Sequence, residues 1–320
     1  MRILFAASED AWGGFLNRVK RLLPEHEFIA QGCFEITDLS GFDILIPTMS
    51  KVTQTVLKTA DRLRLIQQCG AGLELVDINA AREQGIFVAN VPTDISGNAD
   101  SVAEIAIYLM IGLSRNIDGM KESLKNRIMG GPMGISLKGR IVGIVGLGGI
   151  GKALINRLRP FNVKLIGIKQ FNPEQAQRKL GLDWVGGPDD LDILLEQSDY
   201  VVLCLPLNHS NQGMMNEKTL KLMKANAFLI NVSRGGLVDY TALKSALKKK
   251  EIAGAGLDVF WEEPPEPADE IFQYNIIATP HIGGATDVSM QGIAESVAMN
   301  IDRIAKGEIP VNQAVVEMIK

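Results

Sequence analysis

The chain has 320 residues, of which 46% are hydrophobic and 22% are charged. This balance is typical of folded globular proteins and excludes a mainly disordered chain, and the length allows two domains of ordinary size. The formal net charge of −4 leaves no overall basic field that could hold nucleic acid.

The cysteines and the N-terminus favour a reducing compartment. Cys33, Cys69 and Cys204 stand far apart without metal-ligand spacing, so we expect neither a disulfide framework nor a metal site. The N-terminal sequence MRILFAASED has too short an apolar run for a signal peptide. The longest apolar helical stretch, Val102–Leu113, falls well below the ~20 residues needed to span a bilayer. We therefore expect a cytoplasmic protein.

The first ninety residues alternate short apolar runs with helical patterns. Strands are predicted at Ile3–Ala6, Asp43–Ile46, Leu65–Cys69 and Ile86–Ala89, and helices at Gly14–Leu23, Thr53–Asp61 and Asp77–Gln84. Strands and helices in alternation imply a parallel sheet that is covered by helices.

One long helix is predicted over Asn98–Met120, with Ser96 as a candidate cap. A second alternation follows it, and the last helix, Val288–Lys306, ends before Gly307 and Pro310. In a chain of two α/β units, a cleft between the units is the natural place for a ligand. The further strands are Ile141–Val145, Val163–Ile168, Tyr200–Leu205, Ala227–Val232, Gly254–Leu257 and Ile276–Thr279, with helices in the gaps, for example Gly149–Leu158, Asp189–Gln197 and Thr241–Lys249.

A glycine-rich turn follows the predicted strand Ile141–Val145. Gly146, Gly148 and Gly151 fit the pattern GxGxxG. The first glycine allows a tight turn, the second lets backbone approach a pyrophosphate, and the third lets helix and strand pack closely. Such turns also occur without ligands, but the strand–turn–helix context favours dinucleotide binding.

The acid that usually binds the ribose of NAD is missing. It is expected about 20 residues after the glycine turn, yet no Asp or Glu occurs between Lys152 and Pro173, and Lys169 follows the predicted strand Val163–Ile168. A cation there can attract a ribose phosphate, which favours NADP but leaves NAD open. A solvent-exposed lysine at a strand end is the structural alternative.

Three later segments carry ionisable groups just after predicted strands, where α/β proteins usually build sites. Arg234, followed by two glycines, can present a planar fork to a carboxylate. His281 alone among the three histidines is framed by a strand, a proline and two glycines. Hydride chemistry on an alcohol needs a group that gives or takes a proton near neutral pH, which is the natural role of histidine. A nearby acid such as Glu263 would favour the protonated imidazole.

Each of these residues also has a structural explanation. A single histidine near a strand end is more often a satisfied structural group, and an arginine there is commonly a member of a surface ion pair. Glu263 before Pro264 fits ordinary loop chemistry. Trp261 either caps the pocket or packs as a surface aromatic. Downstream of a dinucleotide loop, the group as a whole favours catalysis.

Five motifs in the correct order resemble the D-isomer-specific 2-hydroxyacid dehydrogenase family. This family includes glyoxylate/hydroxypyruvate reductases, D-3-phosphoglycerate dehydrogenases and phosphite dehydrogenases. The resemblance covers nearly the whole chain. The motifs are NADSVAE at 98–104, GLGGIG at 146–151, SRGGLVD at 233–239, LDVF at 257–260 with Glu263 and Pro264, and TPHIGG at 279–284.

The resemblance implies an NAD(P)-dependent oxidoreductase that moves a hydride to or from a small D-2-hydroxy or 2-oxo acid, of the glyoxylate/hydroxypyruvate reductase type. Arg234 would hold the substrate carboxylate and carbonyl, His281 would be the general acid/base, and Glu263 would pair with His281. Backbone N–H groups of Ala71 and Gly72 would bind the substrate carboxylate. The cofactor-binding residues would be Gly146, Gly148, Gly149, Ile150, Gly151, Lys169, Leu205, Pro206, Val232, Ser233, Asp258, Gly283 and Gly284, with Asp258 at the nicotinamide amide.

The resemblance also implies two doubly wound parallel-sheet α/β domains. A flavodoxin-like substrate domain would comprise residues 1–97 and 288–320, and a Rossmann nucleotide domain would comprise residues 98–287. Members are usually homodimers paired through the helix that Asn98–Met120 resembles. We therefore expect a small acid and a second copy of the chain as partners, with no nucleic acid or membrane, and no regulatory domain.

Three departures from the family pattern limit these expectations. Gly149 stands where an arginine often touches the pyrophosphate, and Lys169 replaces the acid of NAD-binding members. Pro47 stands where phosphoglycerate dehydrogenases tend to have arginine, which lowers the case for that substrate. Phosphite oxidation stays open, whereas formate dehydrogenase would need Gln in place of Glu263. The alternative from another class is a nucleotide-sensing interaction protein, like the corepressors that share this fold.

Overall fold

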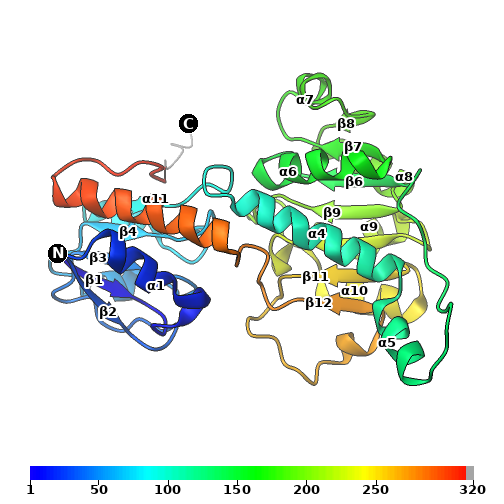
Figure 1. Cartoon of the computed structure of the whole chain (residues 1–320). Coiled ribbons are helices and arrows are strands. Elements are labelled where there is room, and N and C mark those ends of the chain that lie inside the picture. Colours follow the sequence, from blue (N-terminus) through cyan, green and yellow to red (C-terminus); the bar gives the residue numbers. More distant parts are fainter. Residues whose placement is uncertain (315–320) are drawn as a thin grey trace. The chain divides into compact units, whose positions relative to one another are not determined.

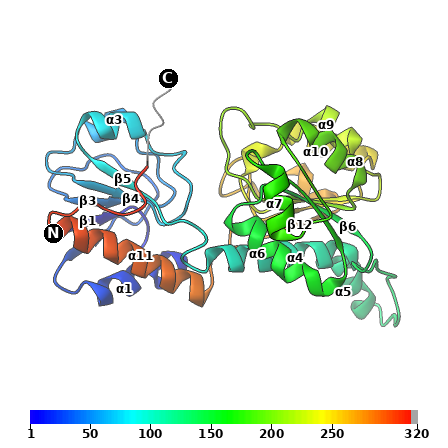
Figure 2. The ribbon, with the colours of Figure 1, turned by 90° about the horizontal axis from the view of Figure 1, so that it is seen from above.

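The computed structural model describes residues 1–314. The chain divides into two compact units, each shown with its helices and sheet in Figures 1 and 2. Unit 1 comprises Met1–Asn98 and the chain from Ala285 onward, and unit 2 comprises Ala99–Gly284. Each unit contains one parallel sheet with a buried apolar cluster on either face. Parallel strands that are buried on both faces need nearly continuous apolar sequence, which explains the short apolar runs.

The sheet of unit 1 has five strands in the order β2-β1-β3-β4-β5, which is the flavodoxin-like order. Helices α1 (Ala11–Leu22) and α11 (Asp287–Ala305) lie on one face, and α2 (Gln54–Leu57) and α3 (Ile78–Glu83) cover the other (Figure 2). The strands are β1 (Arg2–Phe5), β2 (Glu27–Ala30), β3 (Ile44–Ile46), β4 (Leu65–Gln67) and β5 (Phe87–Ala89).

The sheet of unit 2 has seven strands in the order β12-β11-β10-β9-β6-β7-β8, which is a Rossmann order extended by one strand. Figure 2 shows α4 and α6 on one face of the sheet and α8, α9 and α10 on the other. The strands are β6 (Ile141–Val145), β7 (Lys164–Ile168), β8 (Trp184–Gly186), β9 (Tyr200–Leu203), β10 (Phe228–Asn231), β11 (Gly254–Leu257) and β12 (Ile276–Ala278). The helices are α4 (Asn98–Ser114), α5 (Ile117–Lys125), α6 (Gly149–Leu158), α7 (Pro173–Leu180), α8 (Leu191–Gln197), α9 (Glu217–Leu222) and α10 (Tyr240–Lys249).

The predicted fold class is confirmed, because both sheets are parallel and doubly wound, with the two expected strand orders. The predicted strands Ile141–Val145 and Gly254–Leu257 and the helix Gly149–Leu158 have the bounds found in the structure. Within the described part of the chain, every helix is too short or too polar to cross a membrane.

The prediction of one helix over Asn98–Met120 is wrong. Asn116 adopts a left-handed conformation (φ 50°), and its side chain accepts a hydrogen bond from the N–H of Gly119, so α4 ends at Ser114 and α5 begins anew. Asparagine tolerates this conformation better than most residues. Ser96 does not cap α4, because its buried hydroxyl lacks a hydrogen-bond partner among the described residues.

Candidate active site

The residues that the sequence predicts for the dinucleotide and the chemistry follow the carboxyl ends of six parallel strands in unit 2. The strand order reverses between β6 and β9, which is the switch point where open α/β sheets bind nucleotides. The glycine turn and the start of α6 (146–151) follow β6, Lys169 follows β7, and Leu205 and Pro206 follow β9. Val232–Arg234 follow β10, Asp258 and Glu263 follow β11, and His281–Gly284 follow β12.

The glycine turn at the start of α6 is closely packed around Gly146 and Gly151 and has open space beside Gly148. Gly146 has a φ of 101°, and a Cβ atom there would lie 2.8 Å from the backbone of Cys204. A Cβ atom on Gly151 would lie 2.2 Å from the carbonyl oxygen of Gly146, whereas one on Gly148 would meet nothing within 4 Å. The free N–H groups of the α6 N-terminus follow this open side. The turn therefore fits the pyrophosphate of a dinucleotide.

Two buried side chains fix the loops after β9 and β10. The Ser233 hydroxyl donates to the carbonyl of Leu205. Asn231, 1% exposed, accepts from the N–H of Ser233 and donates from Nδ2 to the carbonyl of Arg234 (2.8 Å). Sequence reasoning missed the role of Asn231, although a polar residue that closes a buried strand was the available signal. Asn231 thus determines how the chain presents Arg234.

Lys169 lies directly after β7, as predicted from the sequence. Its backbone N–H donates to the carbonyl of Gly186 on the neighbouring strand β8 (3.0 Å). The side chain is partly exposed and forms no ion pair with any residue that the structure describes. The charge at this position is therefore available to a ligand.

His281 and Glu263 form a close pair. The Nδ1 atom of His281 lies 2.7 Å from Oε2 of Glu263, and their side chains are 33% and 19% exposed. His281 has a left-handed backbone (φ 52°), which is uncommon outside glycine and often marks a functional site. Since Nδ1 faces the carboxylate, Nε2 is the ring atom left for proton transfer.

Glu263 is stabilised in its charged form. Burial by itself would raise the pKa of its carboxyl, but the hydrogen bond and charge of His281 lower it, as do the N–H of Phe260 and the charge of Arg234. The net effect is a pKa below the ordinary value. The other carboxylate oxygen, Oε1, accepts from the N–H of Phe260 (3.0 Å). Glu263 is therefore an anion at neutral pH, and its negative charge faces Nδ1 of His281.

Asp258 holds the loop that carries His281. This buried carboxylate accepts from the Thr279 hydroxyl (2.6 Å), the N–H of Ile282 (3.0 Å) and the N–H of Gly283 (2.9 Å). Burial raises the pKa of Asp258, and these three hydrogen bonds oppose the rise. Because its contacts lie on both sides of His281, Asp258 stabilises the left-handed conformation of that residue.

Arg234 belongs to the same group of charges, since its guanidinium acts on the carboxyl of Glu263. Its Nη1 donates to the carbonyl of Ser233 (2.8 Å). A Cβ atom on the next residue, Gly235, would lie 2.1 Å from the backbone of Phe260, so the two loops touch backbone to backbone. An arginine beside a carboxylate-paired imidazole can hold an anion while the imidazole exchanges a proton with it.

Ala71 and Gly72 belong to unit 1, whereas the residues above belong to unit 2. Their turn follows β4 and is fixed by two amides that sequence reasoning missed. Asn90 donates to the carbonyl of Ala71 (2.7 Å), and Gln68 accepts from the N–H of Cys69 and donates to the carbonyl of Thr48 (both 2.9 Å). A polar residue within the predicted apolar strand Leu65–Cys69 was the available signal.

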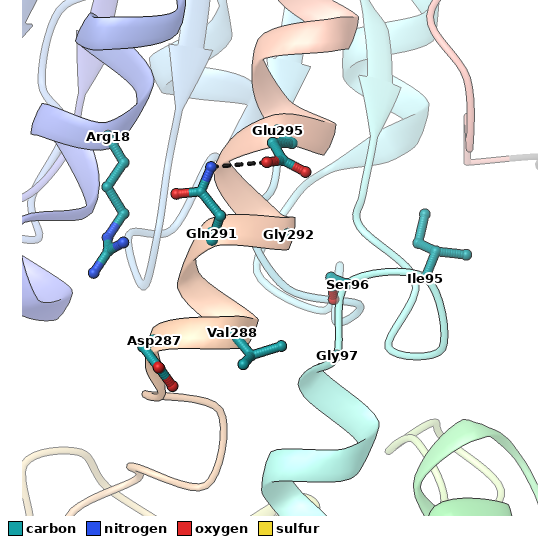
Figure 3. Close-up of a pocket in the computed structure, with 9 residues that line it drawn as sticks. All are labelled: Arg18, Ile95, Ser96, Gly97, Asp287, Val288, Gln291, Gly292 and Glu295. Atoms are coloured by element: carbon teal, nitrogen blue, oxygen red, sulfur yellow. Dashed lines mark hydrogen bonds between the residues drawn. The ribbon is translucent and has the colours of Figure 1, made fainter.

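Unit 1 also contains a hollow of about 640 Å³ at the N-terminal end of α11 (Figure 3). On one side of it, Gln291 donates to Glu295 (2.8 Å). A Cβ atom on Gly292 would lie 2.5 Å from the carbonyl oxygen of Ser96, so this part of the wall is closely packed backbone. None of the residues predicted for substrate or cofactor lines it; the lining residues are Arg18, Ile95, Ser96, Gly97, Asp287, Val288, Gln291, Gly292 and Glu295.

Comparison with known proteins gives consistent matches. The family model described as the NAD binding domain of D-isomer specific 2-hydroxyacid dehydrogenases matches residues 107–283. The glyoxylate reductase of Thermococcus litoralis is 41% identical over 272 residues, which are 82% of this chain and 80% of the relative. The D-3-phosphoglycerate dehydrogenase of Methanocaldococcus jannaschii is 34% identical over 271 residues, which are 84% of this chain but 51% of the relative.

The structure is similar to that of the NADPH-dependent glyoxylate/hydroxypyruvate reductase of Sinorhizobium meliloti, solved in complex with NADP and malonate. The TM-score is 0.83 and the sequence identity 28%, over 98% of this chain and 96% of that one. The glycine turn, the strand-end loops and these matches all agree with the resemblance drawn from the motifs. The chain therefore belongs to the D-isomer-specific 2-hydroxyacid dehydrogenase family and is an NAD(P)-dependent oxidoreductase.

Proposed function

We propose that this protein reduces glyoxylate or hydroxypyruvate to the corresponding 2-hydroxy acid. The observation that carries the proposal is the His281–Glu263 pair, 2.7 Å apart and within the field of Arg234, on the edge of the sheet that also bears the glycine turn. The similarity to the glyoxylate reductase of Thermococcus litoralis supports this choice of substrate.

In this proposal, each of the three residues has one task. A nicotinamide cofactor held by unit 2 would supply or accept the hydride at carbon 2 of the acid. Arg234 holds the carboxylate and the carbonyl oxygen through its planar fork. His281 gives a proton from Nε2 to the carbonyl oxygen as the alcohol forms, and Glu263, at Nδ1, keeps the imidazole protonated and oriented until then.

Unit 1 is proposed to be the substrate domain, as expected for residues 1–97 and 288–320, and unit 2 the nucleotide domain, as expected for residues 98–287. The turn at Ala71 and Gly72 would offer backbone N–H groups to the substrate carboxylate. The structure supports this role because Asn90 donates a hydrogen bond to the carbonyl of Ala71, which orients the adjoining peptide. The role in substrate binding itself rests on the family resemblance.

Unit 2 is proposed to bind the cofactor through the predicted set Gly146, Gly148, Gly149, Ile150, Gly151, Lys169, Leu205, Pro206, Val232, Ser233, Asp258, Gly283 and Gly284. We propose NADP(H) as the preferred form, because Lys169 lacks an ion-pair partner among the described residues. A well-formed contact with the ribose phosphate would add about 1.5–3 kcal/mol. Asp258 already accepts three hydrogen bonds, so its reach toward the nicotinamide amide would use its remaining lone pairs.

A homodimer through the stretch Asn98–Met120 is proposed from the family resemblance, and we extend the proposed interface along α5 and the loop that follows it. Exposed apolar side chains on this stretch support it, since large apolar patches often mark interfaces. Its prominent members are Tyr108, Ile111, Leu124, Ile128, Met129 and Met133, the last two 89% and 92% exposed. The test is the molar mass of the protein in solution, compared with that of the double variant Met129→Glu/Met133→Glu, in which the dimer should be disrupted. A reducing, cytoplasmic location is proposed with it, supported by three free cysteines.

The test is the oxidation of NADPH and NADH with glyoxylate, hydroxypyruvate, pyruvate, 3-phosphohydroxypyruvate and no acid. We expect glyoxylate or hydroxypyruvate to have the highest kcat/KM, by about tenfold over the others, and hydroxypyruvate to give D-glycerate. A preference for the phosphorylated acid would identify a phosphoglycerate dehydrogenase instead. Phosphite is tested as well, with the oxidised cofactor. If the protein binds the dinucleotide but turns over neither an acid nor phosphite, a nucleotide-sensing interaction protein is favoured.

A further inference from the structure

Trp261 lies in the loop after β11 that also carries Glu263, and its side chain is packed against neighbouring residues. Its indole Nε1 donates to the carbonyl of Val238 (2.5 Å). Its ring meets the ring of Tyr240 edge to face, with centroids 5.1 Å apart and planes at 85°. Val238 and Tyr240 lie in the segment that follows Arg234. Of the two sequence-based interpretations of Trp261, the packed aromatic is therefore supported.

The loop of Glu263 is attached to the segment of Arg234 at a second place. A Cβ atom on Gly235 would lie 2.1 Å from the backbone of Phe260 and 2.6 Å from the nitrogen of Trp261. The N–H of Phe260 in turn donates to Oε1 of Glu263 (3.0 Å). The carboxylate that faces His281 is thus bonded to the residue directly before Trp261.

A third contact closes the far end of the loop. The Tyr240 hydroxyl donates to Oδ1 of Asp269 (2.6 Å). This bond raises the pKa of Tyr240 to about 12, and hydrogen bonds from Ile271 and Tyr240 lower the pKa of Asp269. Neither partner changes its charge between pH 5 and 10, so this contact cannot itself create a pH dependence in that range.

We propose that Trp261 is a positioning residue that keeps Glu263 against His281. Its contacts hold the Glu263 loop against the segment that carries Arg234. Arg234 and Glu263 therefore keep a fixed position relative to each other. This inference rests on the proposed function for its catalytic consequence. The restraint of Glu263 itself rests on the contacts of Trp261, Gly235 and Phe260 and is independent of the proposed function.

The charged groups that face the His281–Glu263 pair are Arg234 and Asp258. Arg234 favours the anionic form of Glu263, and Asp258 is fixed by its bonds to the His281 loop. Neither contacts the indole of Trp261 in any hydrogen bond or ring contact of the described residues. Loss of the indole N–H should therefore act on His281 through the distance to Glu263.

The first experiment compares Trp261→Phe, which keeps an aromatic ring and loses the donor, with Trp184→Phe as the matched control. Trp184 is also partly buried in unit 2, but it lies on β8. Strand β8 is at one edge of the sheet, whereas β11, whose loop carries Trp261, lies next to the other edge strand, β12. We expect Trp261→Phe to lower kcat for reduction by about two- to tenfold, the factor of one neutral hydrogen bond. The alkaline limb of the pH–rate profile should move to lower pH, and KM for the dinucleotide should stay unchanged. Trp184→Phe should leave the profile in place.

The second experiment separates positioning from general destabilisation. In the Glu263→Gln background, Trp261→Phe should add no further shift of the profile, because residues that act through one another are not additive. Equal shifts in both backgrounds would overturn the proposal. So would an unchanged profile in the single variant Trp261→Phe.

A third readout does not depend on catalysis. The ring signal of His281, assigned by comparison with His281→Ala, is followed by NMR as a function of pH in the parent and in Trp261→Phe. We expect its titration midpoint to be lower in Trp261→Phe than in the parent. If this shift occurs in a protein that turns over no 2-oxo acid, the proposed function fails and the positioning role stands. If the midpoint is the same in both proteins, the positioning role fails.

Discussion

The Nδ1 atom of His281 lies 2.7 Å from Oε2 of Glu263, and each partner is held in place by a separate support. Glu263 is fixed through Oε1 by the N–H of Phe260, and the His281 loop is fixed by the hydrogen bonds of Asp258. The pair is therefore preorganised by backbone contacts from two neighbouring strand-end loops. Preorganised charges of this kind cost no rearrangement at the moment of reaction.

Glu263→Gln should move the alkaline limb of the reduction profile to lower pH. Reduction consumes the proton of the imidazolium, and the loss of the facing negative charge makes that proton easier to lose. The measurement is kcat against pH in the parent and the variant. An unmoved limb would mean that Glu263 does not act on the proton donor.

The same substitution should change the acid dependence of stability. The pKa of Glu263 is lowered in the folded protein, so its contribution is fully present above the unfolded value of about 4.3 and is lost as pH falls through the lowered folded value. The difference in unfolding free energy between parent and Glu263→Gln should thus shrink from pH 6 to pH 3. Denaturant titrations at several pH values measure it, and a difference that grows on acidification would contradict the assigned direction.

Arg234→Lys should weaken substrate binding and slow turnover. Lysine keeps the charge but loses the planar fork that grips a carboxylate at two points. Dinucleotide affinity, measured by fluorescence titration without substrate, should change little. If that affinity falls while the substrate KM holds, Arg234 belongs to the nucleotide site instead.

Gly148→Ala and Gly151→Ala should separate binding from folding. The first Cβ atom would enter open space in front of α6, so the variant should keep its Tm but raise KM for the dinucleotide. The second would lie 2.2 Å from the carbonyl oxygen of Gly146 and should lower Tm as well. Thermal unfolding and KM, measured for both variants, test the pair. Equal Tm losses would refute the packing roles given to the two glycines.

The alternation of apolar runs sufficed to predict both parallel sheets, because strands buried on two faces are apolar throughout. It did not reveal β2 (Glu27–Ala30) or β8 (Trp184–Gly186). Both are edge strands with only one neighbour, so fewer of their positions must be apolar. The break at Asn116 was also missed, since the apolar spacing continues across it and only the conformation of one residue interrupts the helix.

The candidate site was predictable wherever a residue follows a strand and carries a reactive group, as His281 and Arg234 do. The contacts between loops that support the site were not predictable, whereas Asn231 and Gln68 did leave a signal, a polar residue at the end of an apolar run. Asp258 reaches Gly283 across 25 residues of sequence, and Trp261 reaches Val238 only because the two segments are packed together. Such contacts follow from the finished packing and leave no local pattern. The substrate role of Ala71 and Gly72 stays a prediction.

Lys169→Asp should raise KM for NADPH and improve the use of NADH. An aspartate would repel the ribose phosphate of NADP and could accept hydrogen bonds from the ribose of NAD. The ratio of kcat/KM for NADPH and NADH in the parent and the variant measures this. A strong NADH preference of the parent would refute the proposal that Lys169 binds the ribose phosphate of NADP. Solvent screening limits the expected change to about tenfold.

The central claim, that His281 is the proton donor for reduction of a 2-oxo acid, is tested most directly by His281→Ala. Steady-state oxidation of NADPH or NADH is measured at saturating glyoxylate or hydroxypyruvate, in purified protein whose folding and dinucleotide binding match the parent. We expect kcat to fall by about 10²–10⁴-fold, the usual contribution of a general acid, while the affinity for the dinucleotide holds. Turnover near that of the parent in this folded, cofactor-binding variant would contradict the claim.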